Sequence, residues 1–437
     1  MFLKIVATVI CKALIYFLGF FKMGNRNSVT NNKTMDPYKF KIFQFEIVKP
    51  NRSNGIPLPR SGHRIVSDSA NLYSFGGYNP LILNEEGSRD EDDFAVNSYP
   101  LFQELWKFNF ASKNWKRYNS RQTLPQELAS NAVIREGNFL MVYSCVFGGT
   151  GSPFGYRCSN QLYICRLNDE TGEMFEVTTT GQLPLPQYGQ ALLHHNNYLY
   201  TIGGTTGFSY TCDIHRLHIG KKVWENIYIC QGQSDLEPVG RYRHEIAFDG
   251  KNIYILGGGT ADEAFDFYEI PVFNIETRQW QKIRTKRDPQ TRAHSPYRYV
   301  GVPLPRRCHG AVQIQTENDI HVFVTGGYDG DLVFDDLWRL ELSTMQWRLI
   351  ERCTLPWPTY FHSASVTPEG KLYVFGGIYA DENIRRNNDI VSTWLCIPKL
   401  SEMCWEALLH YYPKIVNCPK NKLINAGLPR HFVQRLE

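Results

Sequence analysis

The 437-residue sequence lacks several features that usually reveal a function. It has no Walker loop, no dinucleotide-binding glycine fingerprint and no GxSxG nucleophile turn. Its eleven cysteines include no CxxC pair and no cluster with histidine at metal-ligand spacing, and their odd number favours a reducing compartment. A net charge of +4 is too small to make nucleic acid the expected partner. The sequence therefore predicts no catalytic residues, no cofactor, no metal and no nucleic acid.

The sequence also lacks an unbroken apolar run long enough to be an evident membrane span. Residues Phe2 to Phe21 are strongly apolar, but Lys4 and Lys12 interrupt them. Residues 1–36, an N-terminal apolar segment and linker, allow three interpretations: a signal anchor, an interfacial amphipathic helix, or translation from Met23 followed by a weak myristoylation pattern. We expect a cytoplasmic or nuclear protein, with N-terminal membrane association left open.

What the sequence does contain is an internal repeat. An apolar run ends in a glycine pair six times, with a period of about 50 residues and two long insertions; the first glycines are Gly76, Gly148, Gly203, Gly257, Gly326 and Gly376. Glycine lets a strand end in a sharp turn because it accepts positive φ. Five units carry a downstream aromatic that we expect to pack between neighbouring sheets: Trp115, Phe175, Trp224, Trp280 and Trp347.

This pattern resembles the kelch repeat, and the resemblance covers Arg60 to Pro398. It implies an all-β fold, a six-bladed β-propeller, which we place at residues 37–398. The sixth unit lacks its last strand, whereas Phe40 to Val48 has strong β character. Because an open propeller would leave two bare sheet edges, we expect residues 40–48 to complete blade 6.

Each repeat begins with a four-residue entry segment on the same rim as the loops after the glycine pairs. Four of these segments end in histidine, at His63, His244, His309 and His362, which we interpret as structural. The arginines could instead grip a carboxylate in a shallow bowl. The candidate substrate-binding residues are Arg241, Arg243 and Arg306, then Arg60 and Arg307, with Tyr242 and Phe208 lining the bowl. The alternative for the arginines is local pairing with acidic neighbours.

After Pro398 the apolar period becomes helical, which predicts a small helical unit at residues 399–437. It could be a helical cap over the propeller edge. However, Leu400, Cys404 and Leu408 resemble the box that binds elongin C, although Lys399 stands where that box has a small residue. Further along, Leu428, Pro429, Phe432 and Leu436 resemble the box that selects cullin 2.

A kelch propeller followed by these two boxes is similar to the kelch substrate receptors of cullin 2 ubiquitin ligases. The resemblance implies a non-catalytic subunit that binds elongin B, elongin C and cullin 2 through its C-terminal unit. It also implies that the bowl binds the free C-termini of substrate proteins, often ending in glycine. An alternative from the same resemblance is a non-catalytic regulator of a stress kinase that restrains protein phosphatase 5. Only the ligase interpretation needs Leu400 and Cys404.

Overall fold

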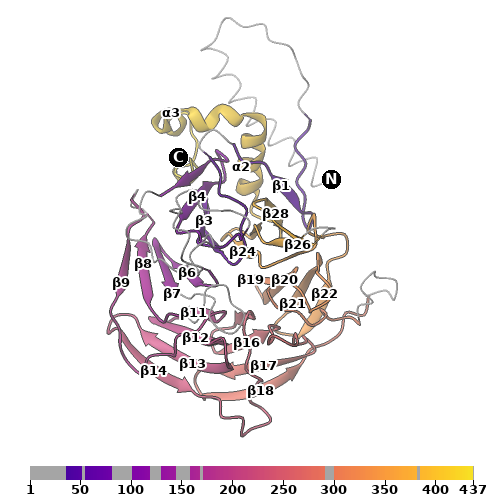
Figure 1. The fold of residues 1–437 in the computed structure, drawn as a ribbon. Coiled ribbons are helices and arrows are strands. Elements are labelled where there is room, and N and C mark those ends of the chain that lie inside the picture. Colours follow the sequence, from indigo (N-terminus) through magenta and orange to yellow (C-terminus); the bar gives the residue numbers. More distant parts are fainter. Residues whose placement is uncertain are drawn as a thin grey trace, which may run out of the picture.

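Six main β-sheets stand in a ring in the computed structural model (Figure 1). The structure describes residues 36–51, 55–80, 101–118, 129–143, 158–167, 171–290, 300–380 and 384–436. The three interpretations of the N-terminal apolar segment, and the glycine pair at Gly148, lie outside these residues. No helix in the described ranges has both the length and the apolar character needed to span a membrane. The predicted all-β propeller is confirmed.

The blades repeat one antiparallel pattern, in which the first strand lines the centre of the ring. Blade 1 contains β2 (Arg64–Ser67), β3 (Asn71–Phe75), β4 (Leu105–Asn109) and β5 (Trp115–Arg117), and blade 2 contains β6 (Ala132–Glu136), β7 (Phe139–Tyr143), β8 (Leu162–Arg166) and β9 (Met174–Val177). Blade 3 contains β11 (Ala191–His195), β12 (Tyr198–Thr205), β13 (Tyr210–His218) and β14 (Val223–Tyr228), with β10 (Thr180–Gly181) on its outer edge. Blade 4 contains β15 (Glu245–Phe248), β16 (Asn252–Leu256), β17 (Glu269–Asn274) and β18 (Gln279–Arg284), and blade 5 contains β19 (Gly310–Gln315), β20 (Ile320–Thr325), β21 (Leu337–Glu341) and β22 (Gln346–Leu349).

Blade 6 is built from both ends of the propeller sequence. It contains β24 (Ser363–Val366), β25 (Lys371–Phe375), β28 (Ile390–Trp394) and, as outer strand, β1 (Glu46–Val48). In β1, Glu46 lies opposite Ser392 and Val48 opposite Ile390. This strand is shorter than the expected 40–48, and Ile42 adds an isolated bridge. A small extra sheet of β23 (Thr359–Tyr360), β26 (Ile378–Ala380) and β27 (Ile384–Arg386) extends blade 6 on the side of the glycine-pair loops.

The repeated glycines and histidines contact each other between neighbouring blades. A Cβ added at Gly376 of blade 6 would lie 2.6 Å from the His63 ring of blade 1, and one at Gly326 would lie 2.6 Å from His362. His63 Nε2 lies 3.0 Å from the carbonyl oxygen of Phe375, the residue before Gly376. Burial lowers the pKa of His362 to about 4, so the ring is neutral inside the protein. In blades 3, 5 and 6 the first glycine thus makes room for the histidine of the next blade.

The downstream tryptophans pack against the preceding blade, as expected. Trp115 lies 5.2 Å from Phe375, and the Trp347 indole donates a hydrogen bond of 3.2 Å to the carbonyl of Phe267. The expectation was wrong for Phe175, whose side chain is 58% exposed. Met174, which lies opposite Cys165, fills the buried position instead. A one-residue offset along a strand moves a side chain to the other face of the sheet.

The C-terminal residues form a helical module beside blades 6 and 1 (Figure 1). It contains α2 (Leu400–Tyr411), the 3-10 helix η1 (Pro413–Asn417), α3 (Lys420–Asn425) and α4 (Arg430–Val433). Its small core holds the stacked rings of Trp405 and Phe432, whose centroids are 5.1 Å apart. Leu423 and Val433 are buried in the same core, so the module has packing of its own.

Candidate functional site

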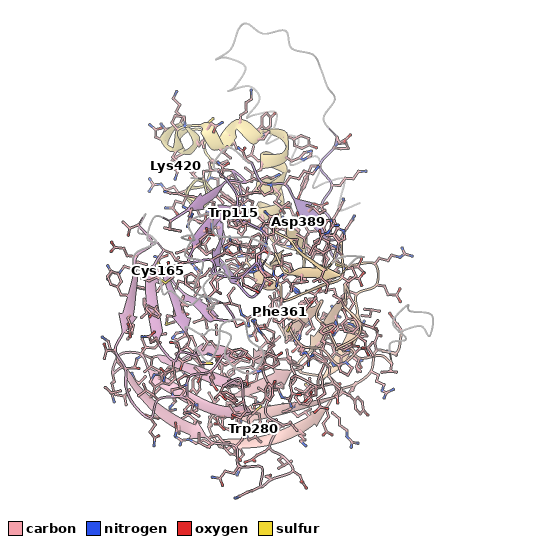
Figure 2. All side chains as sticks on the ribbon, in the orientation of Figure 1. Trp115, Cys165, Trp280, Phe361, Asp389 and Lys420 are labelled. Carbon is pink, nitrogen blue, oxygen red and sulfur yellow. The ribbon has the colours of Figure 1, made fainter. Side chains whose placement is uncertain are left out.

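A belt of peptide hydrogen bonds links the inner ends of the six blades around the centre of the propeller. The residue before each of the four histidines, and the equivalent residue in blades 2 and 3, has a positive φ between 53° and 70°; these residues are Gly62, Ser130, Gly189, Arg243, Cys308 and Phe361. Successive members are bonded through N–H donors and carbonyl acceptors: Ser130 to Gly62, Gly62 to Phe361, Phe361 to Cys308, Cys308 to Arg243, and Arg243 to Gly189, at 2.8–3.2 Å. The belt fixes the inner ends of the blades relative to one another, with Phe361 toward the middle of the ring (Figure 2).

Side chains bridge the channel inside this belt. Arg243 of blade 4 donates to the Ser130 hydroxyl of blade 2, and its guanidinium lies 4.9 Å from the centre of the Phe361 ring of blade 6. Two residues further along the chain from the belt, Arg64 of blade 1 pairs with Glu245 of blade 4 at 2.7 Å. Blades 1 and 4 are opposite in a ring of six. These contacts give a floor to the bowl, by which we mean the face formed by the entry segments and the glycine-pair loops.

The structure does not bring Arg60, Arg241 and Arg306 together in the bowl, which corrects the sequence-based expectation. All three side chains are buried within their own blades. Each Nε donates to the carbonyl two residues earlier, and each Nη1 donates to the carbonyl of the first glycine of the same blade: Gly76, Gly257 and Gly326. These donors are therefore already used in holding the glycine-pair turn.

Aromatic rings and carboxylates complete this structural role. The three guanidinium carbons lie 4.0–4.3 Å from the ring centres of Phe102, Phe265 and Phe334 respectively. Arg60 also pairs with Glu104 at 2.7 Å, and Arg306 binds both oxygens of Asp336. Desolvation lowers the pKa of Arg60 and Arg241, although neighbouring acidic groups oppose this shift. Local pairing, the alternative raised by the sequence, describes Arg60 and Arg306.

Two other arginines lie at the bowl surface. Arg307 stacks 5.7 Å from the Tyr328 ring and donates to the carbonyl of Thr260. Arg386 lies 4.9 Å from the Tyr78 ring, and its Nε donates to the Ser61 hydroxyl at 2.9 Å. Within the ranges that the structure describes, neither arginine forms an ion pair. Desolvation lowers the pKa of Arg386, because burial penalises the charged form of the guanidinium.

Tyrosines fill the space between these cations. The rings of Tyr328 and Tyr360 stack with centroids 5.1 Å apart, and the backbone of Tyr360 pairs with Ile378, which pairs in turn with Arg386. In the entry segment of blade 4, Tyr242 contacts Tyr188 and Tyr210 of blade 3. Phe208 is 67% exposed. This part of the bowl surface thus combines two arginines with aromatic rings.

Sequence reasoning missed Arg386. It lies on the β26–β27 hairpin, which the other described blades do not have, so repeat register gave no signal for it. Arg307 and Tyr242 were found because they follow the first residue of an entry segment, and the backbone of that position faces the glycine-pair loop.

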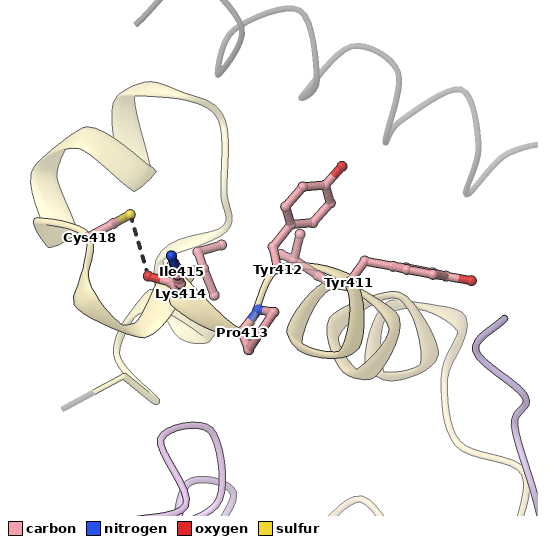
Figure 3. A pocket seen from close by; sticks show the side chains of 7 residues that line it. Tyr411, Tyr412, Pro413, Lys414, Ile415 and Cys418 are labelled. Carbon is pink, nitrogen blue, oxygen red and sulfur yellow. Dashed lines mark hydrogen bonds between the residues drawn. The ribbon is translucent and has the colours of Figure 1, made fainter. Parts of the chain in front are cut away.

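The residues of the proposed elongin box follow one side of α2. Leu400 is 44% exposed, whereas Cys404 and Leu408 are partly buried. A cavity of about 320 Å³ continues from Leu408 at the end of the helix; it is lined by Leu408, Tyr411, Tyr412, Pro413, Lys414, Ile415 and Cys418 (Figure 3). This side of the module therefore offers apolar surface and a recess.

The residues of the proposed cullin box are placed differently. Leu428, Phe432 and Leu436 are buried in the core of the module, with exposed fractions of 8%, 4% and 2%. Pro429 is exposed and precedes α4. The structure therefore gives the three apolar residues a packing role, and any direct contact with a partner at this point falls to Pro429 and its exposed neighbours.

Comparisons with known proteins agree with this architecture. The model of the KLHDC2/KLHL20/DRC7 Kelch-repeats domain matches residues 97–297, and that of the Attractin/LZTR1 beta-propeller matches residues 199–410. The fold, with its glycine–histidine repeats, defines a kelch-repeat β-propeller. The chain belongs to the kelch domain-containing protein 10 family.

Three relatives carry that assignment. The chain is 41% identical to Kelch domain-containing protein 10 of Xenopus tropicalis over 381 residues, 87% of this chain and 86% of the relative. It is 38% identical to the Homo sapiens protein over 425 residues, 96% of this chain and 90% of the relative. The Drosophila melanogaster homolog is 43% identical over 391 residues, 87% of this chain, but these cover only 62% of that longer relative.

Proposed function

We propose that the chain is the substrate-recognition subunit of a cullin 2–elongin B/C ubiquitin ligase and that its bowl binds the C-terminal carboxylate of substrates ending in glycine. The observation that carries the substrate half is the pair of surface arginines, Arg307 and Arg386, which flank stacked tyrosines and form no ion pair among the described residues. A carboxylate can accept bidentate hydrogen bonds from such guanidinium groups.

The shape of the bowl suits a chain end. Arg243 and the ion pair between Arg64 and Glu245 bridge the channel, so a peptide cannot continue through the ring. A free terminus needs no further room beyond its last residue, and glycine adds no side chain there. The flat faces of Tyr328 and Tyr360 offer apolar contact to the preceding residues.

The adaptor half rests on α2. Leu400 projects from the module, and the apolar cavity next to Leu408 extends the same surface. Elongin C would bind along this side of the helix, with elongin B bound to elongin C and cullin 2 contacting the region of Pro429.

The two surfaces lie at opposite ends of the blades. In β25, Lys371 at the first position contacts Glu406 of α2, whereas Phe375 at the last position precedes the glycine pair on the bowl side. Five strand residues span about 16 Å. A substrate in the bowl and an adaptor on the module therefore do not compete for space.

The test of substrate reading is a titration with two peptides that differ only at their end. One peptide ends in glycine with a free carboxylate, and the other carries the same sequence with a C-terminal amide. The proposal expects the acid to bind at least tenfold more tightly; equal affinities would mean that the carboxylate is not read. The same titration with Arg386→Ala tests the role of that arginine. Arg385 is exposed on the same hairpin, so Arg385→Ala is the matched control for the loss of one positive charge.

A further inference from the structure

The adaptor helix is held on the ring-closing blade through one carboxylate. Glu406 of α2 accepts hydrogen bonds from Lys371 Nζ of β25, from Trp394 Nε1 of β28 at 3.1 Å, and from the Tyr38 hydroxyl at 2.8 Å. Its side chain is 23% exposed and that of Lys371 is 22% exposed. The segment before β1, the strands β25 and β28, and the helix α2 thus meet at a single, largely desolvated charge.

The segment before the closing strand makes two more contacts with α2. The backbone N–H of Tyr38 donates to the Tyr411 hydroxyl at 2.8 Å, and His410 Nε2 lies 2.9 Å from the carbonyl oxygen of Asp36. The same segment then continues into β1 on blade 6. Residues 36–48 therefore lie on the module at one end and close the propeller at the other.

Arg435 forms a second tie between module and ring. It binds both oxygens of Glu402 in α2, at 2.6 and 2.9 Å, and one oxygen of Glu369 in the β24–β25 turn at 3.0 Å. Its carbonyl accepts a hydrogen bond of 2.9 Å from Asn109 of blade 1. Blades 6 and 1, the two blades that meet where the ring closes, are thus both joined to the module.

We propose that Glu406 is a positioning residue that couples ring closure to the orientation of the adaptor helix, so that residues 36–48, β28 and α2 open and close as one unit. Loss of the carboxylate leaves Lys371 largely desolvated without its ion-pair partner, which is costly. It also removes the acceptor of the Tyr38 hydroxyl, so the segment that continues into β1 loses an anchor.

This coupling rests on the proposed function for its biological meaning. In the proposed receptor, the substrate binds on one face and the adaptor on the other. The joint between propeller and module then fixes the distance from the substrate to the ubiquitin-transferring end of the complex. A loosened joint would slow transfer without changing either binding affinity.

The structural test is hydrogen exchange of the free, full-length chain, comparing wild type with Glu406→Ala. Alanine is a strong helix former, so faster exchange in α2 would not reflect a lower helix propensity. We expect residues 36–48, β28 and α2 to exchange at least tenfold faster together, while blades 2 to 4 are unchanged. Faster exchange in α2 alone, or none at all, would overturn the coupling. The control is Glu276→Ala, which removes an exposed ion pair of 3.5 Å with Lys251.

A milder variant keeps the test decisive if Glu406→Ala does not fold. Tyr38→Phe removes the one hydroxyl group that binds Glu406 and keeps the aromatic side chain at this position. The coupling predicts faster exchange in α2 as well as in residues 36–48; a change confined to residues 36–48 would contradict it.

A separate arm measures ubiquitin transfer in the complex reconstituted with elongin B, elongin C and cullin 2. Here Glu406→Ala should slow transfer to a bound substrate several-fold at unchanged substrate and adaptor affinity, and an unchanged rate would contradict the positioning role. If wild type shows no adaptor capture, the ligase proposal fails, while the exchange result still decides the coupling.

Discussion

Arg306 and Asp336 form a buried, doubly bonded ion pair inside blade 5, with Nη1–Oδ1 at 2.5 Å and Nη2–Oδ2 at 2.8 Å. This is the geometry in which an arginine grips a carboxylate, but the carboxylate belongs to the same blade. The guanidinium also closes the glycine-pair turn through the carbonyl of Gly326. The main role of Arg306 is therefore to stabilise the fold of blade 5.

Replacing Arg306 by alanine should lower the free energy of unfolding by about 3–5 kcal/mol, because the buried Asp336 carboxylate loses its cationic partner. Urea denaturation measures the change. Arg348→Ala is the control, since that side chain is 51% exposed and its ion pair with Glu341 is long, at 3.9 Å. Unchanged stability together with lost peptide binding would contradict this role and indicate that Arg306 binds substrate.

Replacing Arg386 by alanine should weaken binding of a glycine-ended peptide acid at least tenfold, since a hydrogen bond to a charged group contributes about 1.5–3 kcal/mol. Arg386→Lys should restore little, because an ammonium group cannot bind both carboxylate oxygens as a planar fork does. Isothermal titration with the acid and the amide measures both effects. A loss of equal size for the amide would show that Arg386 contacts the peptide elsewhere.

Leu400→Asp combined with Cys404→Asp should abolish capture of elongin C and cullin 2, while the thermal transition of the propeller changes little. The reason is that neither side chain is fully buried, and Leu400 is 44% exposed. Affinity purification with mass spectrometry measures the capture. Phe432→Ala is the contrast: it should lower stability by about 3–5 kcal/mol by opening the module core.

Undiminished capture by the double variant would rule out this helix as the adaptor site. A chain ending at Pro398 that still captured a protein phosphatase would support the signalling alternative.

Stability should fall as the pH is lowered from about 6.5 to about 4. Burial lowers the pKa of His362 from 6.5 to about 4 and that of His244 to about 3, and lowers those of His63 and His309 as well. In this range the unfolded chain binds protons that the folded chain does not, so the free energy of unfolding decreases on acidification. Each unit of pKa shift corresponds to about 1.4 kcal/mol.

Urea midpoints at several pH values in this range measure the slope. His362→Gln should flatten it, and Gln190 occupies the same position in blade 3. An unchanged slope in the His362→Gln variant would contradict the assignment to buried histidines.

Met174→Ala should cost about 2–5 kcal/mol, whereas Phe175→Ala should stay within about 0.5 kcal/mol. Met174 is 4% exposed in the core between blades 1 and 2, and Phe175 is 58% exposed. Chemical denaturation of the two variants distinguishes them. A larger loss of stability for Phe175→Ala than for Met174→Ala would indicate that Phe175 packs between the sheets.

The sequence alone determined the architecture, because that architecture depends on a local pattern repeated many times. The glycine pairs, the histidines and the four tryptophans each satisfy a short-range requirement, namely a positive φ, a ring that fits against glycine, or a large side chain between sheets. The helical period after Pro398 predicted the C-terminal module for the same reason.

Only the tertiary structure decided which arginines are available to a ligand. Arg306 and Arg307 are neighbours in sequence, yet one is buried against Asp336 and the other lies at the bowl surface. Burial and ion pairing depend on residues brought from elsewhere, such as Arg386 from its hairpin and Phe361 across the channel. The joint at Glu406 has the same origin: Lys371 and Trp394 are cross-strand partners in blade 6, and Tyr38 reaches the same carboxylate from the other end of the propeller sequence.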